Sequence, residues 1–338
     1  MQLSEIWFLL IAVLFVGFMF LEGFDFGVGM GTRFLATNSL ERRVLINTIG
    51  PFWDANEVWL ITAGGAMFAA FPHWYATLFS GYYLPFVILL LALIARGVAF
   101  EFRSRSPQEK WRNIWDWAIF IGSILPPFLV GVLFTSLIKG LPVQSDMNMY
   151  LGFTDVVNIY TVVGGVTFVL LSYVHGLTFL TLKTTDPLCE RARAQAMKLY
   201  WWLGLSLLVF IGLTAVYTDA FADKAVYTIT LFAVAIVAYL LLYQQLRNHK
   251  EGFSFALTGI ITVVITAFFF VTLFPNVMIR SIDQANTIPV YAASSGDYSF
   301  KVMPLVPFTL VPVVLAYTIW SYYVFRKRVT ADKEQLTY

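Results

Sequence analysis

Long apolar stretches alternate with short polar connections along the whole chain. Nine such stretches lie at about residues 6–30, 50–71, 78–101, 114–138, 156–182, 198–218, 225–246, 255–279 and 302–326. A helix needs about 20 apolar residues to cross the hydrocarbon core of a bilayer, so each stretch is long enough to span. The pattern predicts an all-α polytopic membrane protein with nine transmembrane helices.

The order of the stretches suggests how the helices are grouped. We expect a first four-helix bundle in residues 1–140, a second four-helix bundle in 141–280, and an outer loop, a ninth helix and a cytoplasmic tail in 281–338. The first five residues, MQLSE, carry no basic side chain. A cleavable signal peptide begins with positive charge, so the first apolar stretch is expected to be a retained span.

The composition supports a membrane protein and argues against other classes. The chain has 338 residues, of which 59% are hydrophobic and 12% are charged, whereas soluble domains carry about 25% charged residues. The 22 Lys and Arg residues nearly cancel the 20 Asp and Glu residues, which is not the balance of a nucleic-acid-binding protein. A single cysteine excludes an intrachain disulfide and a cysteine-based metal site.

The basic residues are distributed unevenly between the two sets of connections. Seventeen of the 22 lie in the connections that follow the first, third, fifth and seventh stretches and in the tail, and four lie in the other set. Cytoplasmic loops carry the excess of Lys and Arg in membrane proteins. This predicts that the N-terminus lies outside and the C-terminus in the cytoplasm.

Ionisable residues at membrane depth are concentrated in the first four stretches. In chain order they are Glu22, Asp25, Asp54, Glu57, Arg96, Glu101 and Asp116. A charge at the centre of a bilayer costs about 2.5–3.5 kcal/mol or more, so such residues are seldom idle. Glu22 and Glu101 could each reach a helix end or the lipid interface, which favours a structural interpretation for these two.

The remaining residues are expected to meet near the cytoplasmic face. At 1.5 Å per residue, Asp25, Asp54, Arg96 and Asp116 all fall within ~10 Å of that face. We expect Arg96 to neutralise one carboxylate and the other acids to lie in a common polar pocket. Two interpretations stay open at this point: a proton relay, because crowded carboxylates hold exchangeable protons, or an ion-pair clamp between helices.

Other residues near this pocket invite a structural interpretation first. Gly23, Gly27 and Gly31 recur every fourth residue, a spacing that lets another helix approach closely. Trp53 and Trp59 flank the acidic pair of the second stretch, where they either anchor the interface or line an oxygen or proton route. His175 is the only histidine well inside a span. A packed, hydrogen-bonded histidine is favoured there over a haem ligand, and no metal site is expected.

Five blocks in the first 140 residues carry a distinctive pattern. They are LEGFDFGVGM (21–30), TRFL (32–35), ERRVLINTIGPFWDANEVWLITAGGAMFAAFP (41–72), FRSR (102–105) and WRNIWDWAIFIGSILPPFLVGVLF (111–134). These blocks strongly resemble subunit II of the cytochrome bd family of quinol oxidases. The second half is similar mainly in its span pattern and in SSGDYS…VM (294–303), which looks like the Gram-positive-type branch.

The resemblance implies a respiratory complex of the bacterial cytoplasmic membrane that oxidises quinol and reduces dioxygen to water. It implies that haem b and haem d are carried by the partner, subunit I, and that this chain holds no cofactor of its own. It points to Asp25, Asp54, Arg96 and Asp116 as the functional polar set. We expect proton transfer to involve these four residues and Glu57, although some members of the family carry glutamine at the position of Glu57. A small single-span subunit and membrane lipid are further partners that the resemblance suggests.

The resulting hypothesis is that the chain scaffolds the haem subunit and supplies it with cytoplasmic protons, with Asp54 as the favoured relay residue. Two rival hypotheses remain. One is a proton-coupled secondary transporter, although such folds place their sites at the midplane and in both halves. The other is a purely structural partner subunit, whose polar cluster only braces helices.

Overall fold

The computed structural model describes residues 2–144, 146–281, 287–303, 305–332 and 336, and they are almost entirely helical. The long helices are α1 (Leu3–Phe34), α3 (Trp53–Ala70), α5 (Tyr83–Phe102), α6 (Glu109–Lys139), α8 (Ile159–Lys183), α9 (Leu188–Tyr217), α11 (Ala225–Arg247), α12 (Glu251–Leu273) and α15 (Leu305–Val324). Between them lie shorter helices: α2 (Ser39–Ile49), α4 (Pro72–Gly81), η1 (Arg103–Arg105), α7 (Phe153–Val156), α10 (Ala220–Asp223), α13 (Val290–Ala293) and α14 (Asp297–Val302). Two antiparallel strands, β1 (Asn276–Met278) and β2 (Ile288–Pro289), lie in the loop after α12.

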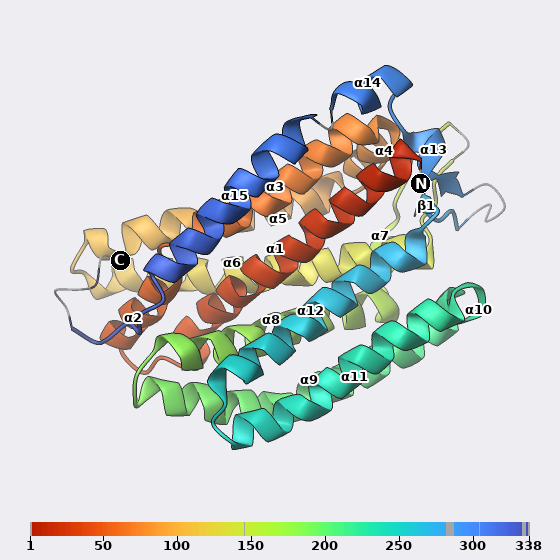
Figure 1. Cartoon of the computed structure of the whole chain (residues 1–338). Helices are drawn as coiled ribbons and strands as arrows, with labels where there is room; N and C mark the ends of the chain where they lie inside the picture. Colours follow the sequence, from red (N-terminus) through yellow and green to blue (C-terminus); the bar gives the residue numbers. More distant parts are fainter. Residues whose placement is uncertain (1, 145, 282–286, 304, 333–335, 337–338) are drawn as a thin grey trace.

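The polytopic all-α architecture predicted from the sequence is confirmed. Among the described residues, seven helices are long and apolar enough to cross a membrane, and each corresponds to a predicted span. The other two predicted spans correspond to α3, which carries Asp54 and Glu57, and to α15, whose apolar part covers Thr309–Val324. Helix α3 packs against α1, and α15 runs alongside α3 (Figure 1). The count of nine spans therefore stays a prediction.

Helix α1 lies at the centre of the molecule. It packs against α3 and α6 on one side and against α8 and α12 on the other. Helices α9 and α11 lie at the far edge of the second group, and α15 covers α3 and α1 at the opposite edge (Figure 1). The proposed division at residues 140 and 280 stays a prediction. Helices α6 and α8 pack closely against each other across the first of these boundaries.

The contact between α1 and α8 depends on glycine. A Cβ atom at Gly27 would overlap the carbonyl oxygen of Ser172, and one at Gly176 would lie 2.5 Å from the backbone of Gly27. The close helix approach that the glycine spacing predicts is therefore confirmed at Gly27. This approach fixes the position of α1 along the axis of α8, and with it the positions of Glu22 and Asp25.

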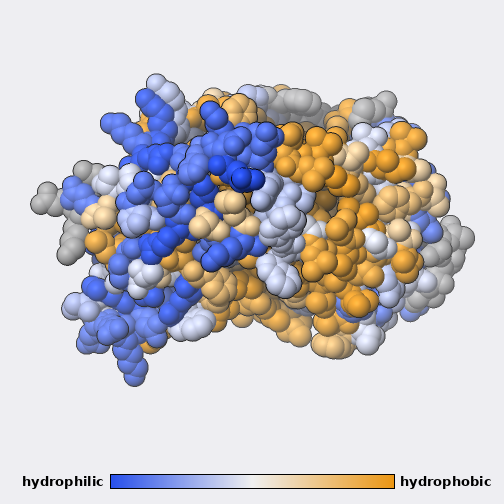
Figure 2. Space-filling model, turned by 90° about the horizontal axis from the view of Figure 1, so that it is seen from below, coloured by the Kyte–Doolittle hydropathy of each residue, from blue (hydrophilic) through white to orange (hydrophobic). Residues whose placement is uncertain are grey.

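Exposed apolar side chains cover the length of the bundle. On α9 and α11, for example, Trp201, Leu208, Val226 and Leu240 are each more than 60% exposed, as expected for surfaces that face lipid. Figure 2 shows hydrophobic surface over the middle of the molecule and a concentration of hydrophilic residues at the end where α1 gives way to α2. The N- and C-terminal ends of the chain lie at opposite ends of the bundle (Figure 1).

Candidate functional site

Four charged side chains from three helices meet inside the first helix group. Arg96 of α5 forms an ion pair with Glu22 of α1, and its Nη1 lies 3.7 Å from Oε2 of Glu57 on α3. Asp25, one turn after Glu22, lies close enough to interact with all three. Glu22, Asp25 and Arg96 are fully buried, and the side chain of Glu57 is 19% exposed. We call these four residues the Arg96 cluster.

The surrounding sequence explains how a guanidinium is held at this depth. The carbon of the Arg96 guanidinium lies 4.9 Å from the ring centre of Phe26 and 5.1 Å from that of Phe100, so aromatic faces cover the cation. Helix α6 approaches closely because residue 122 is glycine: a Cβ there would lie 2.7 Å from Cβ of Arg96. The cluster is therefore built by α1, α3 and α5 and sealed by α6.

Asp25 has a second connection that the sequence did not reveal. Nδ2 of Asn56 on α3 donates a hydrogen bond of 2.7 Å to Oδ2 of Asp25. Oδ1 of the same amide accepts a hydrogen bond of 2.9 Å from the hydroxyl of Tyr322 on α15. Asn56 lies between the two acids of the sequence WDANE, and this position is the one signal that could have singled it out. Nothing in the sequence linked Tyr322 to this site.

Several polar atoms of the Arg96 cluster are buried without a hydrogen-bond partner among the described residues. They are Glu22 Oε2, Asp25 Oδ1, Glu57 Oε2, and Nε and Nη2 of Arg96. In folded proteins the large majority of buried polar groups have a hydrogen-bond partner. Buried polar groups without a protein partner mark sites of bound water or of catalytic function. This concentration of unpaired atoms makes the Arg96 cluster the candidate functional site.

The expected common pocket is wrong in two respects, because Asp116 lies in a different cluster and Asp54 is exposed on the outer surface of α3. Oδ1 of Asp116 accepts a hydrogen bond of 2.5 Å from Nε of Arg103, and its Oδ2 lies 3.4 Å from Nη1 of Arg42. Gly122 marks the level of Arg96 on α6, and Asp116 precedes it by six residues, or ~9 Å along the helix. Asp116 therefore joins α6 to the chain segments nearer the helix ends.

The interpretation of Glu22 also needs correction. From the sequence we expected it to reach a helix end or the lipid interface, but its side chain is fully buried and is the ion-pair partner of Arg96. The depth of Glu22 was ambiguous, because the sequence alone did not show that α1 runs from Leu3 to Phe34 and is surrounded on both sides.

Asp54, the favoured relay residue, lies on the outer surface of α3. It is exposed, as are Ala55, Val58 and Ile61 on the same face. Trp53 packs against Phe100 of α5 with ring centres 5.3 Å apart. Trp59 contacts α1 at Gly17, where a Cβ would overlap its ring. Their proposed role in lining a route stays a prediction.

His175 occupies the core between α8, α12 and α1. Nδ1 shares a hydrogen bond of 2.7 Å with the hydroxyl of Thr258, and Nε2 lies 3.1 Å from the carbonyl oxygen of Phe20. The ring also stacks on Phe255, with centres 4.7 Å apart. Both ring nitrogens are thus engaged, so this histidine does not fit the role of a haem ligand. In the described ranges there is no group of three or more His, Cys, Asp or Glu side chains that could hold a metal ion.

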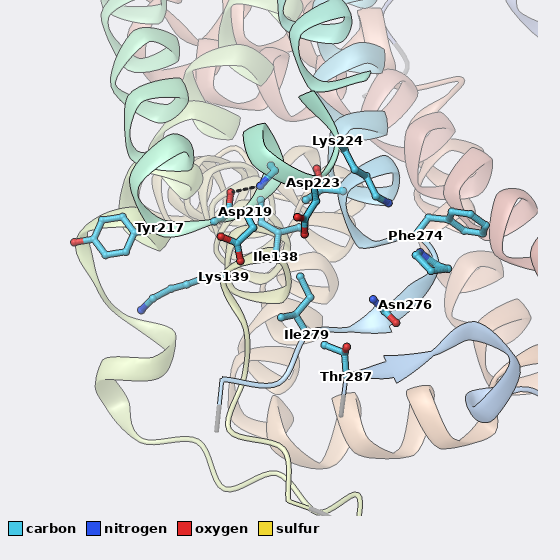
Figure 3. Close-up of a pocket in the computed structure, with 14 residues that line it drawn as sticks. Ile138, Lys139, Tyr217, Asp219, Asp223, Lys224, Phe274, Asn276, Ile279 and Thr287 are labelled. Atoms are coloured by element: carbon cyan, nitrogen blue, oxygen red, sulfur yellow. Dashed lines mark hydrogen bonds between the residues drawn. The ribbon is translucent and has the colours of Figure 1, made fainter. Parts of the chain in front are cut away.

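A cavity of about 420 Å³ lies at the other end of the bundle, where α6, α9 and α12 end. Asp219 and Asp223 point toward its middle, Lys139 and Tyr217 lie to one side, and Lys224 and Phe274 lie to the other (Figure 3). It contains none of the residues predicted from the sequence to act in proton transfer, so the cavity and the Arg96 cluster are separate features.

The sequence and fold match those of known proteins over nearly their whole length. Residues 3–325 match the family described as cytochrome bd terminal oxidase subunit II. The chain is 53% identical to cytochrome bd ubiquinol oxidase subunit 2 of Bacillus subtilis (strain 168), covering 100% of this chain and 99% of that protein. It is 35% identical to cytochrome bd-I ubiquinol oxidase subunit 2 of Escherichia coli (strain K12), covering 98% and 96%.

A solved structure has the same fold. It is the bd oxidase from Geobacillus thermodenitrificans, which superposes with a TM-score of 0.78 at 16% identity and covers 96% of this chain and 97% of the matched chain. The fold defines a polytopic helical membrane protein, and the sequence relatives place it among the subunits of cytochrome bd oxidases. More specifically, the chain belongs to the cytochrome bd terminal oxidase subunit II family.

Proposed function

We propose that this chain, as subunit II of a bd-type quinol oxidase, supplies cytoplasmic protons to the partner subunit through the Arg96 cluster. The place of the chain in such an oxidase follows from its family and its relatives. Quinol oxidation and oxygen reduction take place on haems, and we propose that haem b and haem d are carried by subunit I. The engaged ring of His175 supports this division of labour.

The charge balance of the Arg96 cluster carries the proposal. Three carboxyl groups, those of Glu22, Asp25 and Glu57, surround one guanidinium. One guanidinium compensates one carboxylate, and uncompensated charge is strongly unfavourable in a buried site. The other two carboxyl groups therefore hold protons, and Glu57, which is partly exposed, gives those protons a way in and out.

The position of Asp54 supports the last step of the proposed path, in which protons pass from this chain to subunit I. An exposed carboxylate on an apolar membrane-facing surface is unfavourable unless a partner covers it. The outer faces of α3 and α5 form such a surface around it, with Val58, Ile61, Leu91 and Ile94 all more than 45% exposed. We propose that subunit I docks on this surface and that Asp54 passes protons to it.

The Asp116 cluster fits the clamp interpretation better. Asp116 has two cationic partners, Arg103 and Arg42, and Arg103 is 1% exposed. Its charge is fully compensated, so it needs no exchangeable proton. We propose that it braces the cytoplasmic ends of α2, η1 and α6.

We further propose the orientation predicted from the basic residues, with the N-terminus outside and the C-terminus in the cytoplasm. The hydrophilic end of the molecule, where α1 gives way to α2, is then the cytoplasmic end (Figure 2). A small single-span subunit and bound lipid are additional partners of the proposed complex. The Arg96 cluster lies toward the cytoplasmic side of the membrane in this orientation, which suits uptake of protons from the cytoplasm.

The experiment compares Asp25→Asn and Asp54→Asn in the purified complex. Both variants should keep full haem content while quinol oxidase turnover falls at least about tenfold, because positioned proton carriers contribute factors of about 10²–10⁴. Asp146→Asn, in an exposed loop where the carboxylate accepts hydrogen bonds from Asn148, is the control and should turn over normally. Normal turnover of both test variants at every pH would leave only the structural role.

A further inference from the structure

The C-terminal helix α15 reaches the Arg96 cluster through one side chain, Tyr322. Its hydroxyl donates a hydrogen bond of 2.9 Å to Oδ1 of Asn56, and Nδ2 of Asn56 donates one of 2.7 Å to Oδ2 of Asp25. Asn56 is 1% exposed and Asp25 is fully buried. Groups from three helices thus form one chain of hydrogen bonds that ends on a buried carboxyl group.

We propose that Tyr322 is a positioning residue for proton transfer at Asp25 and acts through the amide of Asn56. The inference rests on the proposed function, because it takes Asp25 to exchange protons. An amide group has one acceptor end and one donor end. The hydroxyl of Tyr322 holds the acceptor end, so the donor end faces Asp25 and stabilises the charge that remains after Asp25 has released its proton.

The hydroxyl of Tyr322 keeps the amide of Asn56 in this orientation. A phenylalanine at position 322 has no donor for the acceptor end of the amide. The donor end would then be held less firmly toward Asp25, the charged form of Asp25 would be stabilised less, and Asp25 would release its proton less readily.

The position of Tyr322 is fixed by packing and by the end of its helix. Its ring stacks on Phe52, with centres 4.2 Å apart and planes at 8°. Phe325 follows Tyr322 by about one helical turn. Its carbonyl oxygen accepts a hydrogen bond from Nζ of Lys183 on α8, which also donates a hydrogen bond of 3.2 Å to the carbonyl oxygen of Lys327. These bonds hold the last turn of α15 against the body of the protein, so the hydroxyl of Tyr322 is held at a fixed height beside Asn56.

Four groups from four helices set the electrostatic surroundings of Asp25. Glu22 lies on the same helix, Glu57 on α3, Arg96 on α5, and Tyr322 on α15. The three charged groups are unchanged in a Tyr322→Phe variant. A change in the pH dependence of that variant therefore reports on the hydrogen-bond chain itself.

The test compares the pH profile of quinol oxidase turnover in the intact wild-type complex and in Tyr322→Phe. The pH of half-maximal turnover should move upward by roughly 0.5–1 unit, the equivalent of one hydrogen bond, while haem content stays complete. Tyr323→Phe is the matched control, because Tyr323 is the next residue and is 62% exposed, and its profile should match the wild type. An unchanged profile in Tyr322→Phe would overturn the inference.

Two further variants separate this inference from the proposed function. Asn56→Ala removes the amide and leaves the tyrosine, and it should shift the profile in the same direction as Tyr322→Phe. In an Asp25→Asn background, Tyr322→Phe should change nothing further. Wild-type turnover of Asp25→Asn would overturn the proposed function itself, whereas a loss in Asp25→Asn together with wild-type profiles in Tyr322→Phe and Asn56→Ala would overturn only the role of Tyr322.

Discussion

Arg96 forms its ion pair with Glu22, one turn of α1 away from Asp25. Both partners are completely buried, so neither can be compensated by bulk water. Because Arg96 is paired with Glu22, the hydrogen-bond donor to Asp25 is the neutral amide of Asn56. This arrangement gives Glu22 the role of balancing charge and leaves Asp25 available to exchange a proton.

Removing the cation should destabilise the protein strongly. In Arg96→Gln the carboxyl group of Glu22 loses its partner, and breaking a buried ion pair costs about 3–5 kcal/mol. We expect a lower Tm and loss of haem from the purified complex. The double variant Glu22→Gln/Arg96→Gln removes both charges and should regain a large part of the lost stability. A double variant no more stable than Arg96→Gln would contradict the pairing.

The proposed docking surface makes a prediction about assembly. Ala55 lies beside Asp54 on the exposed face of α3, so a tryptophan there should hinder close packing of a partner subunit while remaining compatible with lipid. We expect Ala55→Trp to reduce co-purification of subunit I severalfold. Ala215→Trp on the exposed face of α9 is the control, and it should assemble normally. Equal recovery of subunit I in both variants would place the interface elsewhere.

The contact between α1 and α8 predicts a difference between two glycines. Gly27→Ala would force the new Cβ into the carbonyl oxygen of Ser172, and overpacking of this kind costs about 1–3 kcal/mol. Gly212→Ala on α9 meets nothing within 4 Å and should be neutral or slightly stabilising, because alanine favours a helix. Thermal unfolding of the two purified variants measures the difference, and similar Tm values would argue against the close approach.

A pH-dependent contribution to stability is expected at Glu41, outside the spanning helices. Burial raises the pKa of this carboxyl group, but hydrogen bonds from Thr37 and the guanidinium of Arg191, 2.6 Å away, outweigh burial and hold the pKa below its usual value. A carboxyl group with a lowered pKa stabilises the folded state above the pKa of the unfolded chain, and this stabilisation is lost as the pH falls.

Glu41→Gln should therefore reduce stability at pH 7 by about 0.2–1 kcal/mol, the range of partly exposed ion pairs. The difference from the wild type should shrink as the pH falls below about 4, near the usual pKa of glutamate. Denaturation of both proteins across pH measures it. The exposed Glu109→Gln is the control, and a deficit in Glu41→Gln that does not depend on pH would contradict the ion-pair account.

The sequence predicted the architecture well because apolar length and charge distribution are local properties. Each predicted span has a helix at its place, and the spacing of Gly23, Gly27 and Gly31 correctly indicated a close helix contact. The family resemblance, carried by blocks such as LEGFDFGVGM, is confirmed over residues 3–325.

The partners of the charged residues could not be predicted in the same way. Depth along a helix is readable from the sequence, but the direction in which a side chain points depends on which helices pack together. Asp116 and Arg96 both lie in the half of the bundle nearer α2, yet they belong to different clusters, because Asp116 pairs with Arg103, which lies just beyond the end of α5. Tyr322 contacts Asn56 across 266 positions of sequence, and no local pattern indicates such a contact.

Infrared difference spectroscopy of the complete complex, recorded between its oxidised and reduced states in H₂O and in D₂O, tests most directly whether the buried acids exchange protons. The account predicts a carbonyl band of a protonated carboxylic acid that moves in D₂O, is absent from Asp25→Asn and persists in the Asp146→Asn control. A wild-type spectrum without such a band, or one that Asp25→Asn leaves unchanged, would contradict a proton path through the Arg96 cluster.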